Sequence, residues 1–529
     1  MYVRKQRLFV FLPFVFGIVF LVLMSLFIIY QVDVVAGGNE INQTIRYVSP
    51  DGNDTGNDCL LSSSPCATIQ HAVDQADPGD EVRIAQGNFS GSQTIMYTDN
   101  YTYTQVVFID QPIILRGGFS TGDWNNSNPN QNETIIDPEG NGRGITIIDT
   151  MNGPVTIEGL TVTGGDYTGL GNPPGVQNQK CRSTDACGGG VYVHNSSVNL
   201  RTLQILNNNA GDGSSEGGGI YLWDAWNLLI DCVNVINNVA MNGAGMAVTE
   251  QHFPLTILNS NFESNVAENT GGGIHLRSNI ESLVTIKNSR LANNIATSED
   301  GGGLEARLSA DGLLLQMDSV WVQDNQANDY GFGISLEAAG PVTPEASFSN
   351  LILSGNKRVA GSEATPKDAV ISINGLFTNL VVDMEHITAA DNQSPSFLYA
   401  EPSHNNGKFV TITITNTLLS DFDYAFTAMD TEGSDTTIQH TKTLFHDVAV
   451  DHNPLGVSPT FISVDPITGN PMLNEAYHLE SESEAIDVGY DSGMDHDIDG
   501  NPRPFGNTPD IGADEYFQSF FYLPIINKK

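Results

Sequence analysis

The sequence predicts an all-β protein built as a parallel β-helix, in which short strands of successive coils stack on one another. Three observations predict it: glycine triplets at a regular period, apolar residues that alternate after each triplet, and an asparagine at a constant place in each coil. The triplets lie at 188–190, 217–219, 271–273 and 301–303, with degenerate copies at 243–245 and 331–333. Steps of 26–30 residues between them are typical of a solenoid.

Each coil is expected to hold three short strands joined by three turns. In the four residues after a triplet, the first and third are apolar and the second and fourth mostly polar or aromatic, as in Ile274-His275-Leu276-Arg277. This period of two indicates a strand with one face inward. A second alternating segment follows, and then a third apolar point, at Ile205, Val235, Phe262, Leu291 and Val322. The glycines are expected to form a tight turn where the backbone passes close to the neighbouring coils.

An asparagine follows each third apolar point by three residues. The predicted ladder contains Asn208, Asn238, Asn265, Asn294, Asn325 and Asn356, and Asn392 fits the same place one coil later. Stacked asparagines can bond each other's amides along a column. We also expect them to adopt the left-handed backbone that a sharp turn requires.

The N-terminus predicts export. Arg4, Lys5 and Arg7 precede 23 uncharged residues, 8–30, which are long enough to span a bilayer. The basic flank would stay in the cytoplasm and the rest would face outward. We predict an uncleaved signal anchor with a transmembrane helix; the alternative is cleavage after Ala36, which would release a secreted protein.

The five cysteines of an exported chain favour disulfides between near neighbours. We predict the pairs Cys59–Cys66 and Cys181–Cys187, with Cys232 free. The alternative is five reduced thiols.

The ends of an open solenoid need covers, because they expose core and strand edges. Residues 67–76 place Ile69, Ala72, Val73 and Ala76 on one helical face, which predicts a short N-terminal helix over the first coil. The expected parts are a signal anchor (1–36), an N-terminal cap module (37–90), the β-helix (91–469), a C-terminal cap module (470–516) and a tail (517–529).

The charge balance limits the partners. The chain has 62 acidic and 22 basic residues, a net charge of −40. Nucleic acid and anionic lipid surfaces are therefore poor partners. Membrane contact is expected only through the N-terminal helix, and the sequence predicts no oligomeric state.

Several stretches resemble known exported proteins. The three-strand coil with an asparagine ladder resembles the right-handed parallel β-helix of the pectin-lyase-like superfamily, and the GGGI and NxA repeats resemble chlamydial polymorphic outer-membrane proteins. Residues 47–89, which begin "YVSPDGNDTGNDC", are similar to an N-terminal module of bacterial exported β-helix proteins. Residues 485–515, with "AIDVG", "DIDGNPRP" and "DIGADE", are similar to their C-terminal module. The resemblance covers nearly all of residues 45–516 and implies a right-handed coil.

The resemblance implies no single activity, because this fold hosts lyases, hydrolases and adhesins. Polygalacturonase-like members carry Asn-Thr-Asp, Asp-Asp, Gly-His-Gly and Arg-Ile-Lys motifs, and none of the four occurs in this sequence. Pectate lyases use carboxylates for calcium and a basic residue beside them. The sequence therefore assigns no catalytic residues.

The outward positions of the first strand offer a binding site. The second and fourth residues after each triplet are expected to face solvent, with an aromatic plate beside a charged cluster. The candidates are Tyr192, His194, Tyr221, Trp223, His275, Arg277, Glu305 and Arg307. Aromatic rings beside a few polar groups suit sugar rings. The alternative is a solvated sheet face whose cross-strand side-chain pairs contribute little to stability.

A second candidate site lies near the C-terminus. Asp495, Asp497 and Asp499 alternate before Gly500, like the start of an EF-hand-type calcium loop. The twelfth loop position is Gly506 rather than glutamate, so Asp510 or Glu515 would have to supply oxygens. The alternative is a structural turn.

We therefore predict a cell-surface β-helix protein that binds polysaccharide or a surface glycan, like an adhesin. The alternative is a polysaccharide lyase or glycoside hydrolase. Calcium is the one cofactor the sequence points to.

Overall fold

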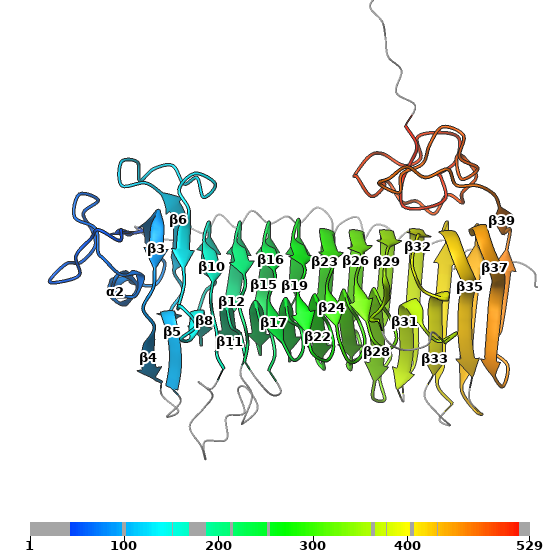
Figure 1. The fold of residues 1–529 in the computed structure, drawn as a ribbon, viewed down its shortest axis with the longest axis horizontal. Helices are drawn as coiled ribbons and strands as arrows, with labels where there is room; N and C mark the ends of the chain where they lie inside the picture. The colour runs from blue at the N-terminus through cyan, green and yellow to red at the C-terminus, as the bar shows by residue number, and fades with distance from the viewer. Residues whose placement is uncertain are drawn as a thin grey trace, which may run out of the picture. The chain divides into compact units, whose positions relative to one another are not determined.

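The described residues form an all-β solenoid, a parallel β-helix of the right-handed type with about 11 turns (Figure 1). In this computed structural model they are 43–97, 102–150, 152–168, 187–211, 215–250, 254–360, 365–376, 378–402, 407–430 and 432–517. As predicted, each regular coil supplies one strand to each of three parallel sheets. We call these the first, second and third sheets, in the order in which a coil visits them after its glycine turn.

The first sheet holds the strands that follow the glycine turns, paired in register from coil to coil. Its strands are β5 (Thr102–Ile109), β8 (Arg143–Ile148), β11 (Val191–His194), β14 (Ile220–Trp223), β18 (Met246–Thr249), β22 (Ile274–Ser278), β25 (Leu304–Leu308), β28 (Ile334–Ala339), β31 (Ala369–Leu376), β33 (Ser396–Pro402) and the later parts of β35 (Leu418–Asp430) and β37 (Leu444–Gly456). One strand, β4 (Gln93–Met96), pairs antiparallel with β5.

The second sheet follows across a bend. Its strands are β1 (Ile45–Val48), β2 (Glu81–Ala85), β6 (Ile114–Phe119), β9 (Val155–Glu158), β12 (Ser197–Arg201), β15 (Trp226–Asp231), β19 (Leu255–Leu258), the first parts of β23 (Leu283–Ala292), β26 (Leu314–Gln323), β29 (Glu345–Ser354) and β32 (Leu380–Ala390), and then β34 (Phe409–Thr415), β36 (Asp435–Thr441) and β38 (Thr460–Val464).

The third sheet follows a bend at which one residue per coil takes a left-handed backbone, for example Asn259 and Asn288. Its strands are β3 (Gly87–Phe89), β7 (Thr134–Ile136), β10 (Thr161–Thr163), β13 (Gln204–Leu206), β16 (Asn234–Ile236), β20 (Asn261–Glu263), the last parts of β23, β26, β29 and β32, the first parts of β35 and β37, and β39 (Ile467–Thr468). In the four 10- and 11-residue strands the second and third sheets are joined across this bend.

A small fourth sheet, which the sequence does not predict, follows the ladder asparagines. It consists of β17 (Val239–Ala240), β21 (Val266–Ala267), β24 (Ile295–Ala296), β27 (Gln326–Ala327) and β30 (Lys357–Arg358). The alanines at its second position are buried and lie between the asparagine turns and the next glycine turns. This explains the small residue of the NxA repeat.

The predicted ladder asparagines form one continuous column of buried amides. From Asn208 to Asn356, each Nδ2 donates to the Oδ1 of the asparagine in the next coil and to a backbone carbonyl of the preceding coil, and each Oδ1 also accepts a backbone N–H. The Nδ2–Oδ1 distances are 3.1 Å for Asn208–Asn238, 3.0 Å for Asn238–Asn265, 2.9 Å for Asn265–Asn294, 3.1 Å for Asn294–Asn325, 3.1 Å for Asn325–Asn356 and 3.0 Å for Asn356–Asn392.

The backbone at this turn differs from the prediction. The left-handed residue is the one before each ladder asparagine, such as Asn293 at φ 55° and Asp324 at φ 54°. None of the ladder asparagines, all of which the structure describes, has a positive φ. The sharp turn and the amide column are therefore supplied by adjacent residues rather than by one.

The glycine triplets bring the backbones of neighbouring coils together. A Cβ atom on Gly272 would lie 2.6 Å from the carbonyl oxygen of Gly302, and one on Gly273 would lie 2.5 Å from that of Gly303. The first glycine, Gly271, has φ +64°, a conformation that side chains disfavour. Steric exclusion therefore accounts for all three glycines.

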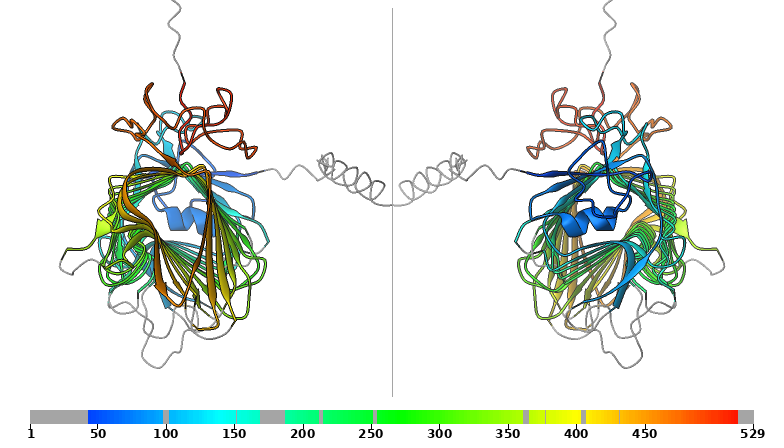
Figure 2. Two further views of the ribbon diagram at one scale, coloured as in Figure 1. Left: turned by 90° about the vertical axis from the view of Figure 1, so that its right-hand side faces the viewer. Right: turned by 90° about the vertical axis from the view of Figure 1, so that its left-hand side faces the viewer.

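The N-terminal segment contains the one helix of the described residues, α2 (Ile69–Gln75). The Thr68 hydroxyl accepts the His71 backbone N–H and begins the helix. Ile69, Ala72 and Val73 belong to the core cluster of the coils. Figure 2 shows α2 within the outline of the coils when they are viewed along their axis.

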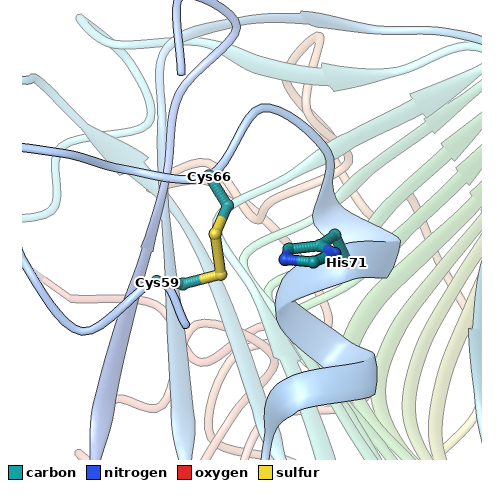
Figure 3. A group of neighbouring side chains, drawn as sticks. All are labelled: Cys59, Cys66 and His71. Carbon is teal, nitrogen blue, oxygen red and sulfur yellow. A yellow bond between two sulfur atoms is a disulfide. The ribbon is translucent and has the colours of Figure 1, made fainter. Parts of the chain in front are cut away.

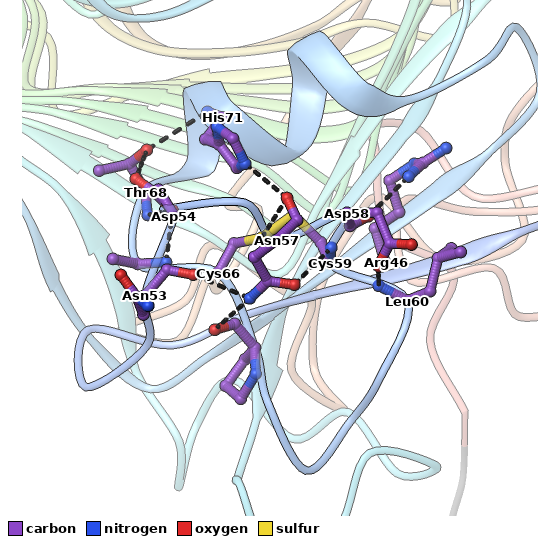
Figure 4. Close-up of a disulfide and its surroundings, with 12 residues drawn as sticks. Arg46, Asn53, Asp54, Asn57, Asp58, Cys59, Leu60, Cys66, Thr68 and His71 are labelled. Carbon is purple, nitrogen blue, oxygen red and sulfur yellow. Dashed lines mark hydrogen bonds between the residues drawn. A yellow bond between two sulfur atoms is a disulfide. The ribbon is translucent and has the colours of Figure 1, made fainter.

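A disulfide fixes the loop before this helix. Cys59 and Cys66 are joined as predicted, and the ring of His71 on α2 lies beside them (Figure 3). The Asn57 Nδ2 donates to the carbonyl oxygens of Asn53, Ser64 and Pro65. The backbone carbonyl oxygen of Asn57 lies 2.7 Å from His71 Nε2 (Figure 4). With both sulfurs in a disulfide, this group does not offer thiolate ligands to a metal.

Other predictions fall partly on residues outside the described ranges. Cys187 is disulfide-bonded, and its predicted partner Cys181 is outside them. Cys232 is free and exposed. Within the described ranges no helix is both long and apolar enough to cross a bilayer, and the predicted transmembrane segment 8–30 lies outside these ranges.

The C-terminal segment 470–516 was expected to cover the end of the last coil, but its contacts lie along the side of the coils. His496 Nε2 is 3.0 Å from Asp318 Oδ2 in β26, Ala513 N–H donates to Thr388 Oγ1 in β32, and Tyr490 N–H donates to Asn416 Oδ1. These partners belong to several successive coils. The segment therefore braces the bend between the second and third sheets.

A layer of rings lies at the inner side of the last coils. His440 is buried, and its Nε2 is 3.0 Å from Nε2 of His452, whose ring stacks on Phe461 at 4.7 Å. Burial, with a smaller contribution from His452, lowers the pKa of His440 to about 4. The folded protein therefore holds this imidazole neutral at pH values where the unfolded chain would protonate it.

This layer predicts acid sensitivity. The unfolded imidazole, with a pKa near 6.5, binds a proton below that pH, whereas folded His440 does so only near pH 4. Stability should therefore fall as the pH drops through this window, by about 2 kcal/mol between pH 7 and pH 5. Urea unfolding at both pH values checks this. The fall should shrink in His440→Leu and stay unchanged in His446→Gln; an equal fall in all three proteins would contradict the prediction.

Candidate functional site

The eight predicted binding residues lie in two columns on the outer face of the first sheet. Pairing in register aligns Tyr192, Tyr221, His275 and Glu305 at the second position after the glycines, and His194, Trp223, Arg277 and Arg307 at the fourth. The strand register is thus the one expected, and the inward neighbours Leu222 and Leu276 are buried in the core.

The second-position column is buried, so the prediction that it faces solvent is wrong. Only 1% of Tyr192, 2% of His275 and 9% of Glu305 is exposed. The cause is the glycine turn itself. The turn folds back over the residue four positions later, so that a Cβ on Gly271 would lie 2.8 Å from His275 Cβ, and one on Gly301 would lie 2.7 Å from Glu305 Cβ.

The predicted aromatic plate is an interior cluster instead. Tyr192 and Tyr221 pack with Tyr103, Phe108 and Ile148 under the N-terminal coils. The Arg143 guanidinium lies over the Tyr192 ring, 4.5 Å from its centroid. These rings stabilise the covering of the first sheet and are not available to stack on a ligand.

The fourth-position column does reach the surface for most of its length. Trp223 is half-buried and stacks on His194 at 4.3 Å, which buries His194. Trp223 Nε1 donates to Glu250 Oε2 at 3.2 Å. In the following coils the column continues through Thr249 and Arg277.

Ion pairs hold the arginines of this column in place. Arg277 Nη1 lies 3.6 Å from Glu216 Oε1, and Arg307 Nε lies 3.0 Å from Glu337 Oε1. Burial raises the pKa of Glu337, and Arg307 opposes that shift. The guanidinium groups are therefore fixed in orientation while their outer edges remain open to solvent.

A small hollow of about 150 Å³ lies between the two arginines. Its lining consists of Thr249, Glu250, Arg277, Ser278, Asn279, Arg307 and Ser309. All of these are hydrogen-bonding side chains, and Glu250 joins the hollow to Trp223. We call the column from Trp223 to Glu337, together with this hollow, the outer row.

Beneath the outer row lies a buried group of ionisable side chains. His275 Nδ1 is 2.6 Å from Glu305 Oε2. Burial, with Asp329 and Glu305 adding repulsion, raises the pKa of Asp300 to about 7, although the N–H of Tyr330 donates to its carboxylate. Asp300 comes directly before a glycine triplet, a position that folds over the outer face. That position is the signal by which the sequence could have identified it.

A larger hollow, of about 420 Å³, lies where the column of asparagine turns ends. It is lined by Asn392, Gln393, Ser394, Pro395, Asp421, Phe422, Asp423, Asp447 and Ala449. Three carboxylates and no basic group line it. It has no counterpart in the predicted site.

The predicted calcium loop does not gather its three carboxylates. Asp497 is fully buried and accepts the backbone N–H groups of Asp499, Asn501 and Glu515. Asp495 lies out in solvent against His496, and Asp499 Oδ2 lies 2.7 Å from His478 Nε2. The prediction that Asp495, Asp497 and Asp499 together bind calcium is therefore wrong, because the central carboxylate accepts backbone N–H groups of the turn.

No protein-family model matches this sequence, and no curated protein matches it. A solved structure that it resembles is the crystal structure of pectate lyase Pel9A, with 12% sequence identity and a TM-score of 0.45. The match covers 89% of this chain and 96% of that one. The similarity is too low to assign an activity. The resemblance to chlamydial repeats and to exported C-terminal modules stays a prediction.

Proposed function

We propose that this protein is an exported β-helix protein that binds polysaccharide along the outer row. The observation that carries the proposal is the hollow between Arg277 and Arg307, open to solvent and lined by polar side chains alone. The row runs from coil to coil along the solenoid axis. A row in that direction suits a chain of repeating units better than a compact ligand.

The side chains of the outer row suit a hydroxyl- and carboxylate-bearing polymer. Arginine presents several N–H donors in a fixed plane, which fits carboxylate and hydroxyl oxygens. Ser278, Asn279 and Ser309 add neutral partners. The half-buried Trp223 gives an apolar edge against which a sugar ring can pack.

The overall charge restricts where an acidic polysaccharide could bind. With a net charge of −40 the chain repels polyanions over most of its surface. The larger hollow with its three aspartates would share that repulsion. Arg277 and Arg307 give the outer row two neighbouring positive groups, each paired with a glutamate.

Removing one arginine should weaken binding without unfolding the coil. Arg307→Ala is expected to raise the dissociation constant for a retained polysaccharide at least about tenfold, since truncating a central contact commonly costs more than 1 kcal/mol. Affinity electrophoresis against neutral and uronate-rich polysaccharides measures it. Trp223→Ala should weaken binding on the same gels.

The matched control is Arg290→Ala. Arg290 lies on the third sheet and is paired with Glu263 at 3.6 Å, like Arg277 with Glu216, but it lies outside the outer row. Its removal should leave migration unchanged. If Arg307→Ala and Trp223→Ala migrate like the parent on every polysaccharide that retards it, the outer row is not the binding site.

A lyase or hydrolase is the second candidate, favoured by Asp300. A carboxyl group with a pKa of about 7 can donate or accept a proton near neutral pH. Incubation with acidic polysaccharides, followed by ultraviolet absorbance of unsaturated uronides and by reducing-end assays, tests cleavage. Cleavage that Asp300→Asn abolishes would favour an enzymatic function. If the parent protein cleaves none of the polysaccharides, binding is the function that remains.

Surface display completes the proposal. The charged flank and apolar stretch at 4–30 support an anchor that leaves the β-helix outside the cell, in the manner of an adhesin. Protease treatment of intact cells tests it, since an outward-facing protein would be cut without lysis.

A further inference from the structure

The C-terminal segment contains a second group of ligating side chains, apart from the predicted calcium loop. His478 Nε2 lies 2.7 Å from Asp499 Oδ2 and 4.0 Å from Asp514 Oδ1. The three ligand atoms all lie within 4.8 Å of one another. Asp514 is buried, Asp499 is exposed, and the group opens to solvent on the Asp499 side.

Bonds from outside the group orient each of the three residues. His478 Nδ1 lies 2.9 Å from the Ala476 carbonyl oxygen, to which it donates, and Nε2 faces the carboxylates. The N–H of Leu479 donates to Asp514 Oδ2, which leaves Oδ1 toward His478. The N–H of Asp499 donates to buried Asp497. The ligand atoms are thus held before any ion arrives.

The segment around this group has only a small apolar core of its own and is otherwise held by polar contacts. It contains no strand or helix, and its buried apolar residues are few: Leu479, Ala485, Ile498, Ile511 and Ala513. The three residues come from separate parts of it, at 478, 499 and 514. Small units with weak cores commonly gain stability from a disulfide or a metal ion.

We propose that His478, Asp499 and Asp514 bind a first-row transition metal ion, with zinc as the best fit. One imidazole and two carboxylates suit zinc or manganese, whereas calcium requires six to eight oxygens. Three protein ligands leave a fourth position for water on the exposed side. The ion would tie the start, middle and end of the segment to one point.

Zinc titration of the full chain tests the site. The protein is stripped with chelator, and zinc is added in excess calcium, which occupies weak acidic sites on the surface. Calorimetry is expected to show one tight zinc ion per chain. Cobalt in its place should give the visible absorbance of a low-coordinate nitrogen- and oxygen-ligated ion. Zinc should also slow proteolysis within residues 470–516.

Variants separate this site from the rest of the surface. His478→Gln and Asp499→Asn should each weaken zinc binding at least about 30-fold. Two controls should keep it: His446→Gln, a histidine beside Asp447 elsewhere, and Asp495→Asn, in the originally predicted calcium loop. No stoichiometric zinc binding by the parent, or parental affinity in His478→Gln, would overturn the proposal. Polysaccharide binding is measured independently and does not depend on this outcome.

Discussion

Asn294→Leu is expected to lower the free energy of unfolding by about 2–6 kcal/mol. The leucine removes the oxygen that accepts both the backbone N–H and the side-chain Nδ2 of Asn265, at 3.0 and 2.9 Å. It also removes the donor to Phe262 O and Asn325 Oδ1. Two buried N–H groups of Asn265 lose their acceptor, and each loss costs about 1–3 kcal/mol. Urea denaturation of the parent and the variant measures the loss.

Asn328→Ala is the matched control, since it removes an exposed amide that donates only to Ser298 O. Its unfolding midpoint should stay close to that of the parent. An Asn294→Leu protein that unfolds at the same midpoint as Asn328→Ala would show that the amide column contributes no net stability.

Gly273→Ala is expected to destabilise the protein by about 3 kcal/mol or more. The new methyl group would lie 2.5 Å from Gly303 O and 3.0 Å from Asn294 Nδ2. Neither neighbour can withdraw, because one is backbone in the adjacent coil and the other belongs to the ladder. Overpacking against such surroundings costs about 1–3 kcal/mol and occasionally more. Soluble yield and thermal unfolding both report it.

Gly122→Ala provides the comparison. Gly122 is exposed, and the nearest atom to its added Cβ would be Ser120 Oγ at 3.9 Å. That change should be close to neutral. If both variants melt with the parent, the coils are able to separate at the glycine turn and steric exclusion does not explain the triplets.

The coil could be predicted from the sequence because the interactions that form it lie within a few residues and recur in every coil. Alternation fixes which side of a strand is buried, and the period places each residue above its counterpart, as in the pairing of His275 with Glu305. The ladder asparagines share a position for the same reason. A single coil would be ambiguous, but repetition removes the ambiguity.

The site could be predicted only in part. Trp223, Arg277 and Arg307 lie on the surface as expected, whereas Tyr192, Tyr221, His275 and Glu305 are covered. The covering depends on how a left-handed glycine sends the chain back over its own strand, a tertiary effect that alternation does not encode. Glu250 joins the site from a turn that no periodic pattern marks, whereas Glu216 and Asp300 each directly precede a glycine triplet.

The sequence also did not predict that segment 470–516 lies along the side of the coils. Its contacts with Asp318, Thr388 and Asn416 join residues far apart in the chain, and each is a polar pairing of ordinary residue types. The His478 group arises in the same way, from three turns that meet.

The amide column also affects how readily its asparagines deamidate. Asparagine converts to aspartate when the next backbone nitrogen attacks the side-chain carbonyl carbon and expels ammonia, after which water opens the succinimide ring. The attack requires the side chain and backbone to rotate freely. Asn294 and its counterparts lack that freedom, since both ends of each amide are bonded. Hydrolysis within the column would place a buried charge against neighbouring oxygens, so the bonds that hold the coil folded also protect its asparagines from this reaction.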